Sequence, residues 1–301
     1  MTEKILISGF SGLIGSAIIS HLESKGHNVV RLVRSLPKHD QHNTISWNIE
    51  RKEIPLELLE NFDAVIHLAG ANIADHRWTP QHKKNILNSR VESTQLLASA
   101  LMKLKHPPKV FFCASAIGYY GNHNPEKIID ENHPVGHDFL ADVCRRWEEA
   151  TQPAQKTGIR VVNLRFRVVL SPKGGALAKM LPIFKLGLGG PLGSGQQVMS
   201  WIALEEIPRI LSFLLETEDI SGPINCVAPQ PVSNKGFTKI LGQVVHRPTF
   251  FPAPSFGIRL LLGEMADALL LGGALVIPKK LIDANYQFNY PDLRSALKFM
   301  F

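Results

Sequence analysis

The 301-residue sequence has few cysteines, and nothing in their arrangement indicates a cross-linked or metal-bound protein. Cys113, Cys144 and Cys226 are odd in number and far apart, so they predict neither a disulfide framework nor a cysteine-based metal site. Free cysteines are typical of a reducing compartment, and we expect a cytoplasmic protein. The twelve histidines do not fall into metal-ligand spacing. The sequence therefore predicts no metal site.

Long apolar runs and long runs of one charge are also absent. The most apolar late stretch, residues 258–277, is interrupted by Arg259, Glu264 and Asp267, which is typical of a packed helix rather than a membrane span. The sequence starts without a basic-then-apolar targeting pattern. The net charge is +7, but Lys and Arg are scattered rather than gathered on one stripe. We therefore expect no membrane or nucleic-acid partner, and the positive charge favours an anionic ligand.

Short apolar segments alternate with amphipathic patterns through the first half of the chain, which is typical of βαβ units around a parallel sheet. Strands are expected at residues 5–8, 28–33, 44–47, 64–68, 110–114 and 161–166, with a further sheet strand at 223–227. Helices are expected at residues 13–25, 80–103 and 139–156. The alternation ends near residue 170, where a glycine-rich segment begins that is typical of a functional loop or lid. The pattern predicts an α/β protein with a doubly wound sheet.

A glycine-rich turn directly follows the first expected strand. Gly9, Gly12 and Gly15 give the spacing GxxGxxG, where the standard dinucleotide fingerprint has GxGxxG. We expect Gly9 to leave the strand in a conformation that side chains disfavour, Gly12 to let the backbone approach a pyrophosphate, and Gly15 to pack the helix closely on the sheet. The N–H groups at the helix start would receive the phosphate charge. The turn predicts a dinucleotide site.

The second expected strand ends at Val33-Arg34-Ser35, where the adenosine ribose of a dinucleotide is normally recognised. An acidic residue there binds a free 2′-hydroxyl, whereas an arginine accommodates a 2′-phosphate. No Asp or Glu follows this strand before Asp40, and Arg34 can donate two hydrogen bonds to a phosphate. The sequence therefore predicts NADP(H) as the cofactor, the alternative being that Arg34 is a solvated strand-end residue.

Several further motifs are more specific than the glycine turn. They are His67-Leu68-Ala69-Gly70, Ala71-Asn72-Ile73, Arg77-Trp78, Asn88-Ser89-Arg90, SAIGYYG at residues 115–121 and GLGGPLGSGQ at residues 187–196. Together they resemble the extended short-chain dehydrogenase/reductase family, and within it the atypical, sugar-nucleotide-epimerase-like subgroup, over nearly the whole chain. The resemblance implies a Rossmann-type domain at residues 1–170, to which residues 198–230 return. It also implies a smaller substrate lobe at residues 171–197 and 231–301, and usually nucleotide-sugar chemistry.

The resemblance also implies which residues meet the cofactor. The pyrophosphate would lie along Gly9, Gly12, Leu13, Ile14 and Gly15, the adenosine end would meet Val33 and Arg34, and the adenine side and ribose would pass Leu68, Ala69 and Gly70. Ser115 would occupy the active-site serine position, one residue further from Tyr120-Gly121 than in typical members. Arg90 stands where typical members have an asparagine and could place a fixed positive charge near ribose or phosphate.

The Tyr-x-x-x-Lys pair of extended members is missing from the helix expected after the serine strand. In those members the lysine lowers the pKa of the tyrosine, which then transfers the proton. Leu140 and Cys144 occupy these positions here, or Phe139 and Val143 if the alignment shifts by one residue. Neither alignment supplies a proton donor, and we expect Cys144 to be a small apolar filler beneath the cofactor rather than a reactive thiol.

Tyr119 and Tyr120 are the remaining acid–base candidates beside Ser115, with packing as their alternative role. Arg165 and Arg167 would face either substrate or a salt-bridge partner at the sheet rim.

The sequence is compatible with two functions. The first is an NADP(H)-dependent oxidoreductase or nucleotide-sugar epimerase with altered catalytic residues, acting on a small molecule in a protein that could be oligomeric. The second is a non-catalytic module that binds and senses NADP(H).

Overall fold

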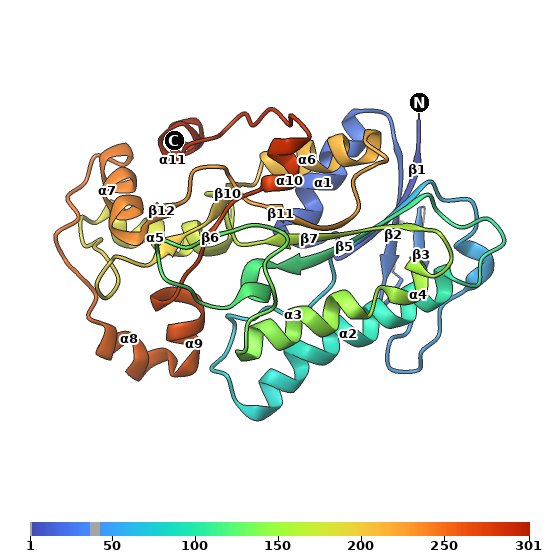
Figure 1. The fold of residues 1–301 in the computed structure, drawn as a ribbon, viewed down its shortest axis with the longest axis horizontal. Coiled ribbons are helices and arrows are strands. Elements are labelled where there is room, and N and C mark those ends of the chain that lie inside the picture. The colour runs from blue at the N-terminus through green and yellow to red at the C-terminus, as the bar shows by residue number, and fades with distance from the viewer. Residues whose placement is uncertain (1, 37–42) are drawn as a thin grey trace.

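The computed structural model describes residues 2–36 and 43–301, and its centre is a parallel sheet of seven strands (Figure 1). The strands lie in the order β11-β7-β5-β4-β1-β2-β3. Their bounds are β1 (Lys4–Ser8), β2 (Asn28–Val33), β3 (Thr44–Ser46), β4 (Ala64–His67), β5 (Val110–Ala116), β7 (Arg160–Phe166) and β11 (Gly222–Cys226). Every neighbouring pair is parallel, so the predicted α/β sheet is confirmed and includes the strand expected near residue 223.

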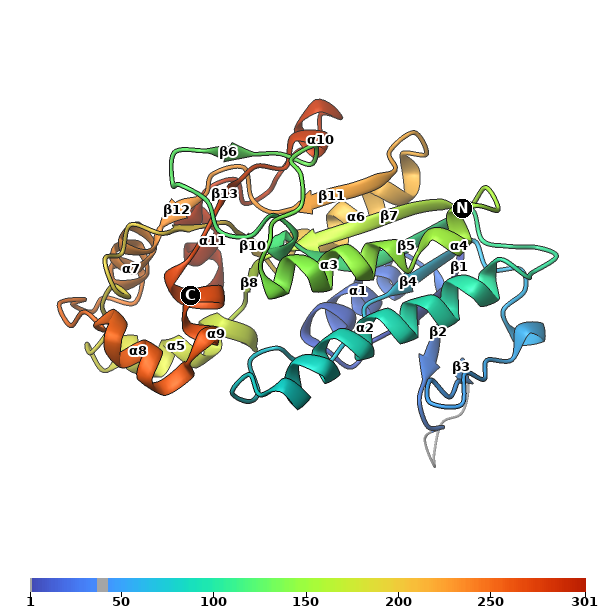
Figure 2. The ribbon, with the colours of Figure 1, turned by 60° about the horizontal axis from the view of Figure 1, so that its bottom comes forward.

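Helices cover both faces of this sheet. One face carries α2 (Pro80–Leu101), α3 (Phe139–Glu149) and α4 (Gln152–Gln155), while α1 (Leu13–Ser24) and α6 (Glu206–Glu216) pack together on the other (Figure 2). All four residues of β4 are buried, as expected for a central strand covered on both sides. Thr79 caps α2 by accepting a hydrogen bond from the His82 amide, and Pro80 is its first residue.

The single helix expected at residues 139–156 is wrong, because the structure divides it into α3 and α4. The chain leaves α3 after Glu149 and starts again at Gln152, with Pro153 in the first turn of α4. Proline has no amide hydrogen and clashes with the preceding turn in a helix interior, whereas it is accepted in a first turn. The break therefore lies where Pro153 requires it.

The remaining elements are short strands, helices and turns, most of which lie beside the carboxyl edge of the sheet (Figure 2). They are the strands β6 (Ile128–Ile129), β8 (Val168–Leu170), β9 (Val198–Met199), β10 (Trp201–Ala203), β12 (Val232–Ser233) and β13 (Leu275–Val276), the helices α5 (Gly175–Lys185), α7 (Asn234–Val244), α8 (Ser255–Leu262), α9 (Glu264–Ala266), α10 (Lys279–Asp283) and α11 (Leu293–Met300), and the short turns η1 (Leu56–Leu58), η2 (Ile117–Tyr120) and η3 (Asp267–Leu271). Leu177, Phe184, Trp201, Phe237 and Leu297 belong to a second buried cluster, separate from that of the main sheet.

The chain returns to the main core near its end. Leu281 and Tyr286 are buried against the cluster around the main sheet, although both lie in the range expected for the second lobe. The Tyr286 hydroxyl is 2.6 Å from Oε1 of Glu206, which is 1% exposed. This contact fastens the last part of the chain to α6. Within residues 2–36 and 43–301, no helix has both the length and the apolar character needed to cross a membrane.

Candidate functional site

The carboxyl ends of the parallel strands bring the predicted site residues to one edge of the sheet. Gly9 follows β1, Arg34 follows β2, Leu68 follows β4, Ser115 lies near the end of β5, and Arg165 lies near the end of β7. Ligands of open α/β sheets bind at this edge, outside the strand ends. The positions of these residues follow from the alternation of strands and helices alone.

The glycine turn makes close backbone contacts that a side chain would prevent. Gly9 has φ of +70°, and a Cβ there would lie 2.6 Å from the Leu68 carbonyl carbon. A Cβ on Gly15 would lie 2.6 Å from Cα of Phe10. Gly12 begins α1 without a side-chain cap, and the first turn of this helix has no acidic residue. The first amides of α1 therefore have no partner within the helix, and its positive dipole end faces a place where an anion fits.

Arg34 and Arg31 differ in their surroundings. Arg31 donates to Oε1 of Glu23 at 3.2 Å. Arg34 is exposed and makes no hydrogen bond or ion pair with any residue of the described ranges. Val33, beside it, is buried. Arg34 is therefore the arginine at this strand end whose guanidinium is available for a ligand, while Asp40 lies outside the described residues.

Arg90 lies against the turn that follows β4. A Cβ on Gly70 would lie 3.2 Å from Cζ of Arg90, whose guanidinium also sits 5.0 Å from the ring centre of Trp147. Its Nη1 donates to the Ile86 carbonyl at 3.0 Å. Burial lowers the pKa of Arg90, with Cys144 close enough to oppose the shift. Arg90 is therefore packed at the site rather than solvated on an exposed helix face.

Leu140 and Cys144 pack against η2. A Cβ on Gly118 would lie 3.3 Å from Cβ of Leu140 and 3.7 Å from Sγ of Cys144. Cys144 is 3% exposed, and burial raises the pKa of its thiol to about 12. At neutral pH the thiol is protonated, and neither side chain can exchange a proton with a ligand.

We expect all three cysteines to be unreactive in the folded protein, because each is buried and burial raises the pKa of each thiol. At pH 8, iodoacetamide should alkylate native Cys144 far more slowly than the same residue in urea, as measured by peptide mass spectrometry. Rapid labelling of native Cys144 would show a thiolate and contradict its role as an apolar filler.

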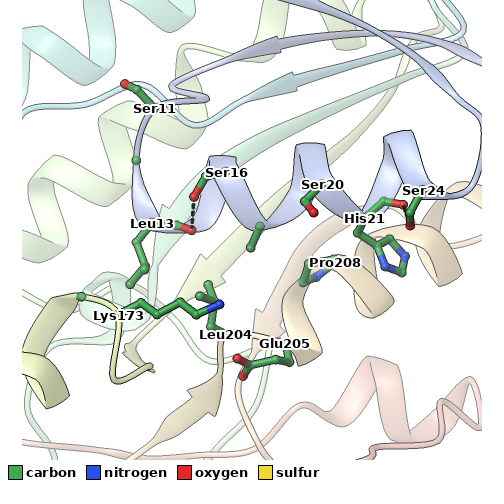
Figure 3. Close-up of a pocket in the computed structure, with 13 residues that line it drawn as sticks. Ser11, Leu13, Ser16, Ser20, His21, Ser24, Lys173, Leu204, Glu205 and Pro208 are labelled. Atoms are coloured by element: carbon green, nitrogen blue, oxygen red, sulfur yellow. Dashed lines mark hydrogen bonds between the residues drawn. The ribbon is translucent and has the colours of Figure 1, made fainter. Parts of the chain in front are cut away.

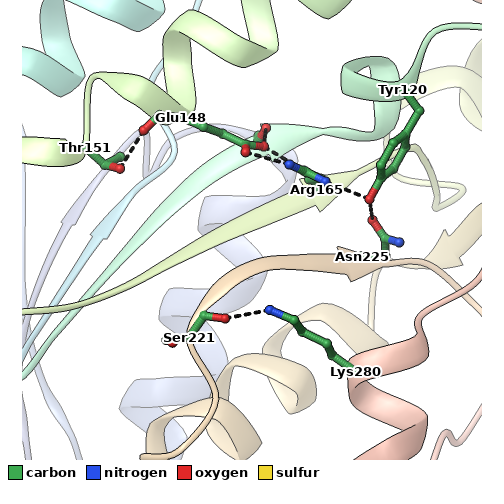
Figure 4. Close-up of polar contacts among 8 residues, drawn as sticks. Tyr120, Glu148, Thr151, Arg165, Ser221, Asn225 and Lys280 are labelled. Carbon is green, nitrogen blue, oxygen red and sulfur yellow. Dashed lines mark hydrogen bonds and ion pairs between the residues drawn. The ribbon is translucent and has the colours of Figure 1, made fainter. Parts of the chain in front are cut away.

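A buried polar network joins the ends of three neighbouring strands (Figure 4). Ser115 on β5 lies opposite Arg165 on β7, and Arg165 lies opposite Asn225 on β11. Glu148 of α3 accepts hydrogen bonds from the Ser115 hydroxyl at 2.7 Å and from Nε and Nη2 of Arg165, both at 2.7 Å. The third guanidinium nitrogen of Arg165, Nη1, donates to the Tyr120 hydroxyl at 2.8 Å. This hydroxyl in turn donates to Oδ1 of Asn225 at 2.7 Å.

The two candidate tyrosines have different environments. Tyr120 is 0% exposed, its hydroxyl is engaged by Arg165 and Asn225, and burial raises its pKa to about 12. Tyr119 is partly exposed, and its ring stacks 3.6 Å from the Arg165 guanidinium carbon. Its hydroxyl makes no hydrogen bond with a described residue. The geometry favours a packing role for Tyr120 and leaves Tyr119 as the tyrosine with a free hydroxyl.

Glu148 and Asn225 are site residues that sequence reasoning did not identify. Glu148 follows Leu140 and Cys144 at steps of four along α3, so the three share one helix face. That spacing was the available signal for Glu148. Asn225 is separated from Tyr120 by 105 residues, and the sequence contains no local signal for that pairing.

His67, at the end of β4, is a structural residue. It is fully buried, with Nδ1 2.6 Å from the Ser8 hydroxyl and Nε2 3.1 Å from the Ser93 hydroxyl. Burial lowers its pKa to about 3, so the ring is neutral. In the described part of the chain, no three His, Cys, Asp or Glu side chains are grouped closely enough to hold a metal ion.

A groove of about 770 Å³ starts at the glycine turn and follows the outer side of α1 (Figure 3). It is lined by Ser11, Gly12, Leu13, Ser16, Ala17, Ser20, His21, Ser24, Lys173, Gly174, Leu204, Glu205 and Pro208. A Cβ on Gly174 would lie 3.2 Å from Cδ1 of Leu13, so the glycine-rich segment touches the turn. Arg34, Arg90 and Ser115 do not line this groove, which therefore meets only the glycine end of the site.

Comparison with known proteins agrees with this arrangement. Residues 5–226 match the model of the NAD dependent epimerase/dehydratase family, and residues 253–300 match a domain of unknown function, DUF1731. Epimerase family protein Mb2239 of Mycobacterium bovis is 43% identical over 293 residues, which cover 97% of this chain and 96% of that protein.

Solved structures share the whole fold. The crystal structure of human epimerase family protein SDR39U1 (isoform 2) with NADPH has a TM-score of 0.90 and 35% identity, and the match covers 99% of this chain and 98% of that one. The nucleoside-diphosphate sugar epimerase from Corynebacterium glutamicum has a TM-score of 0.82 and 33% identity, covering 99% of this chain and 57% of that one. These likenesses confirm the predicted Rossmann-type fold and the predicted family resemblance.

Proposed function

The chain belongs to the NAD-dependent epimerase/dehydratase family, and from this premise we propose that it binds NADP(H) and catalyses hydride transfer with a small-molecule substrate. The observation that carries the proposal is the pairing of the glycine turn with Arg34. Side chains at positions 9 and 15 would clash with the backbone atoms that pack closely in this turn. Arg34, which is exposed and has no partner in the described ranges, lies at the end of the neighbouring strand β2. The human relative crystallised with NADPH supports the same cofactor for this chain.

The residues at the sheet edge fit this cofactor. Gly9, Gly12, Leu13, Ile14 and Gly15 would hold the pyrophosphate against the first amides of α1. Arg34 would bind the 2′-phosphate, with Val33 beneath the adenosine and Leu68, Ala69 and Gly70 along its far side. Arg90, packed on Gly70, would place its positive charge beside the ribose or phosphate. When bound, the nicotinamide accepts or donates a hydride.

Ser115 and Glu148 are the groups that we propose for proton transfer. The Ser115 hydroxyl donates to the Glu148 carboxylate, so its oxygen can accept a hydrogen bond from a substrate hydroxyl. In the oxidation direction the proton of the substrate hydroxyl would pass to Oγ of Ser115, and the proton of Ser115 would pass to Glu148. The bound cofactor would supply the hydride acceptor for the substrate carbon. Arg165 holds Glu148 in place through two hydrogen bonds. Tyr119, whose ring packs on Arg165, is a second group that we propose for hydrogen bonding to the substrate.

Arg34→Ala tests the cofactor assignment. We expect the Kd for NADPH to rise by about 10- to 150-fold, because one charged hydrogen-bond partner contributes about 1.5–3 kcal/mol, while the Kd for NADH stays unchanged. Fluorescence titration of both cofactors measures the two constants. Arg51→Ala, which removes an exposed arginine elsewhere, is the matched control and should alter neither. Equal losses for NADPH and NADH would remove Arg34 from the 2′-phosphate site.

A second candidate function is an NADP(H)-sensing module without turnover. Leu140 and Cys144, two side chains that cannot exchange protons, favour this alternative. Purified protein should be incubated with NADP(H) and a panel of sugar nucleotides, aldehydes, ketones and the corresponding alcohols, with nicotinamide absorbance and product mass as readouts. Sustained turnover that is lost in Ser115→Ala supports the enzyme, and tight NADPH binding with no conversion of any substrate supports the sensor.

A further inference from the structure

Arg167 differs from the other arginines near the end of β7. Arg160 donates to the carbonyls of Leu214 and Ile220 at 3.0 and 2.9 Å, and Arg165 binds Glu148 and Tyr120. Arg167, the first residue after β7, makes no hydrogen bond or ion pair with any residue in the described ranges. It is nevertheless partly buried. A partly buried arginine without a partner is unusual, because the desolvation of a charge is costly unless it is compensated.

No carboxylate in the described ranges compensates the charge of Arg167 at ion-pair distance. Burial lowers its pKa, and the nearby Asp138 opposes the shift. Asp138 is not within ion-pair distance of Arg167, and its carboxylate caps α3 by accepting from the Ala141 amide at 2.8 Å. The guanidinium keeps its proton at neutral pH in any case. An oxyanion of a ligand could accept the two parallel hydrogen bonds that the planar guanidinium group of Arg167 can donate.

The sheet order separates Arg167 from the cofactor phosphates. β7 is three strands from β1, which carries the glycine turn, and neighbouring strands are about 4.8 Å apart, so roughly 14 Å separates the two strand ends. Arg34, beside β1 at the end of β2, is one strand further away. On the other hand, β7 is the direct neighbour of β5, and Phe166 pairs with Ala116, the residue after Ser115. Arg167 therefore lies on the Ser115 side of the site.

From these observations we infer that Arg167 binds an oxyanion of the substrate, so that the substrate carries a carboxylate or a phosphate group. The inference rests on the proposed function for the position of the cofactor. The anion would lie beside the end of β7, with Ser115 on the adjacent strand close to the reacting carbon. The negative charge of nearby Asp138 would oppose an anion that approached on its side of Arg167.

Calorimetric titration of the NADPH-saturated protein tests the inference with three probes: inorganic phosphate, pyrophosphate and malonate. We expect at least one to bind the wild type, and Arg167→Gln to weaken that binding about tenfold or more. Preference for phosphate or pyrophosphate over malonate would identify a phosphate-bearing substrate, and the reverse a carboxylate. Arg51→Gln removes the same charge at an exposed place and should bind like the wild type. Arg167→Lys, which keeps the charge without the fork, should bind with intermediate affinity.

Three results would overturn the inference: no binding of any probe by the wild type, equal binding by Arg167→Gln, or a parallel loss of NADPH affinity in that variant. Arg167→Gln removes no hydrogen bond or ion pair within the described ranges, so its melting temperature should stay close to that of the wild type, and calorimetry of the folded variant is feasible. NADPH titration separates this inference from the proposed function. If the wild type failed to bind NADPH, the proposed function would fail, and the same anion titrations on the cofactor-free protein would still decide the role of Arg167.

Discussion

Arg165→Met is expected to destabilise the protein by about 3–5 kcal/mol, the range found when one partner of a buried ion pair is removed. The side chains of Arg165 and Glu148 are 3% and 12% exposed, so the substitution would leave the Glu148 carboxylate largely desolvated and facing an apolar side chain. It would also leave the Tyr120 hydroxyl without its donor. Urea unfolding followed by circular dichroism measures the change in the free energy of unfolding.

The same helix provides a matched control for this prediction. Arg145 makes comparable contacts with Asp142 and Glu149, at 2.6 and 2.8 Å, but these side chains are 39–48% exposed. Arg145→Met should therefore cost less than about 1 kcal/mol, because exposed ion pairs contribute little. The double variant Arg165→Met/Glu148→Leu should recover part of the loss, since it removes both charges together. A cost for Arg165→Met no greater than that for Arg145→Met would show that the network does not depend on burial.

The same polar network determines the orientation of the Ser115 hydroxyl. Glu148 accepts from Ser115 while Arg165 binds both of its carboxylate oxygens and so orients the carboxylate. Arg165 is in turn fixed by Tyr120, which is anchored through Asn225 to the edge strand β11. The Ser115 hydroxyl donates to Glu148, so its oxygen offers its lone pairs to another donor. In the proposed reaction, an oxygen in this state would accept a proton from an alcohol more readily than it would polarise a ketone, so alcohols are the first substrates to examine.

The sheet and the glycine turn were predictable because their signals are local. Strands such as β4 are buried along their whole length, and the alternation of such segments with amphipathic helices extends over only a few tens of residues. Gly9, Arg34 and Ser115 each follow or end a recognisable strand, so their shared edge follows from parallel pairing. The break between α3 and α4 depends on a single residue, Pro153, within a segment whose pattern is otherwise helical throughout.

The polar network was not predictable, because each of its bonds joins residues that are distant in sequence. Glu148 meets Ser115 across 33 residues, and Tyr120 meets Asn225 across 105. The sequence left Arg165 and Arg167 as equivalent candidates for a substrate contact or a salt bridge. They differ only in tertiary surroundings, since α3 presents Glu148 to Arg165, whereas Asp138 is occupied at the start of the same helix. A one-dimensional pattern does not contain that difference.

Gly9→Ala is expected to abolish NADPH binding and to destabilise the fold by more than about 2 kcal/mol. The left-handed conformation of Gly9 costs a residue with a side chain about 1–2 kcal/mol. In addition, the new methyl group would lie 2.6 to 2.8 Å from the Leu68 carbonyl and the Ala69 amide nitrogen, which are backbone atoms that cannot rotate away. The strands β1 and β4 would have to separate at their carboxyl ends, where we propose that the turn binds the pyrophosphate. NADPH titration and urea unfolding measure the two effects.

Gly26→Ala is the matched control for Gly9→Ala. It introduces the same backbone strain of a positive φ angle, but without a steric clash of the new methyl group. Gly26 has φ of +85°, similar to the +70° of Gly9, but a Cβ there would meet nothing within 4 Å. Gly26→Ala should therefore show only the conformational cost of about 1–2 kcal/mol and should bind NADPH normally. The difference between the two variants measures the contact with the segment after β4. Any alanine at position 9 must change the shape of the turn, because its methyl group would clash with the backbone after β4. If Gly9→Ala nevertheless bound NADPH as tightly as Gly26→Ala, the cofactor would not lie on this turn.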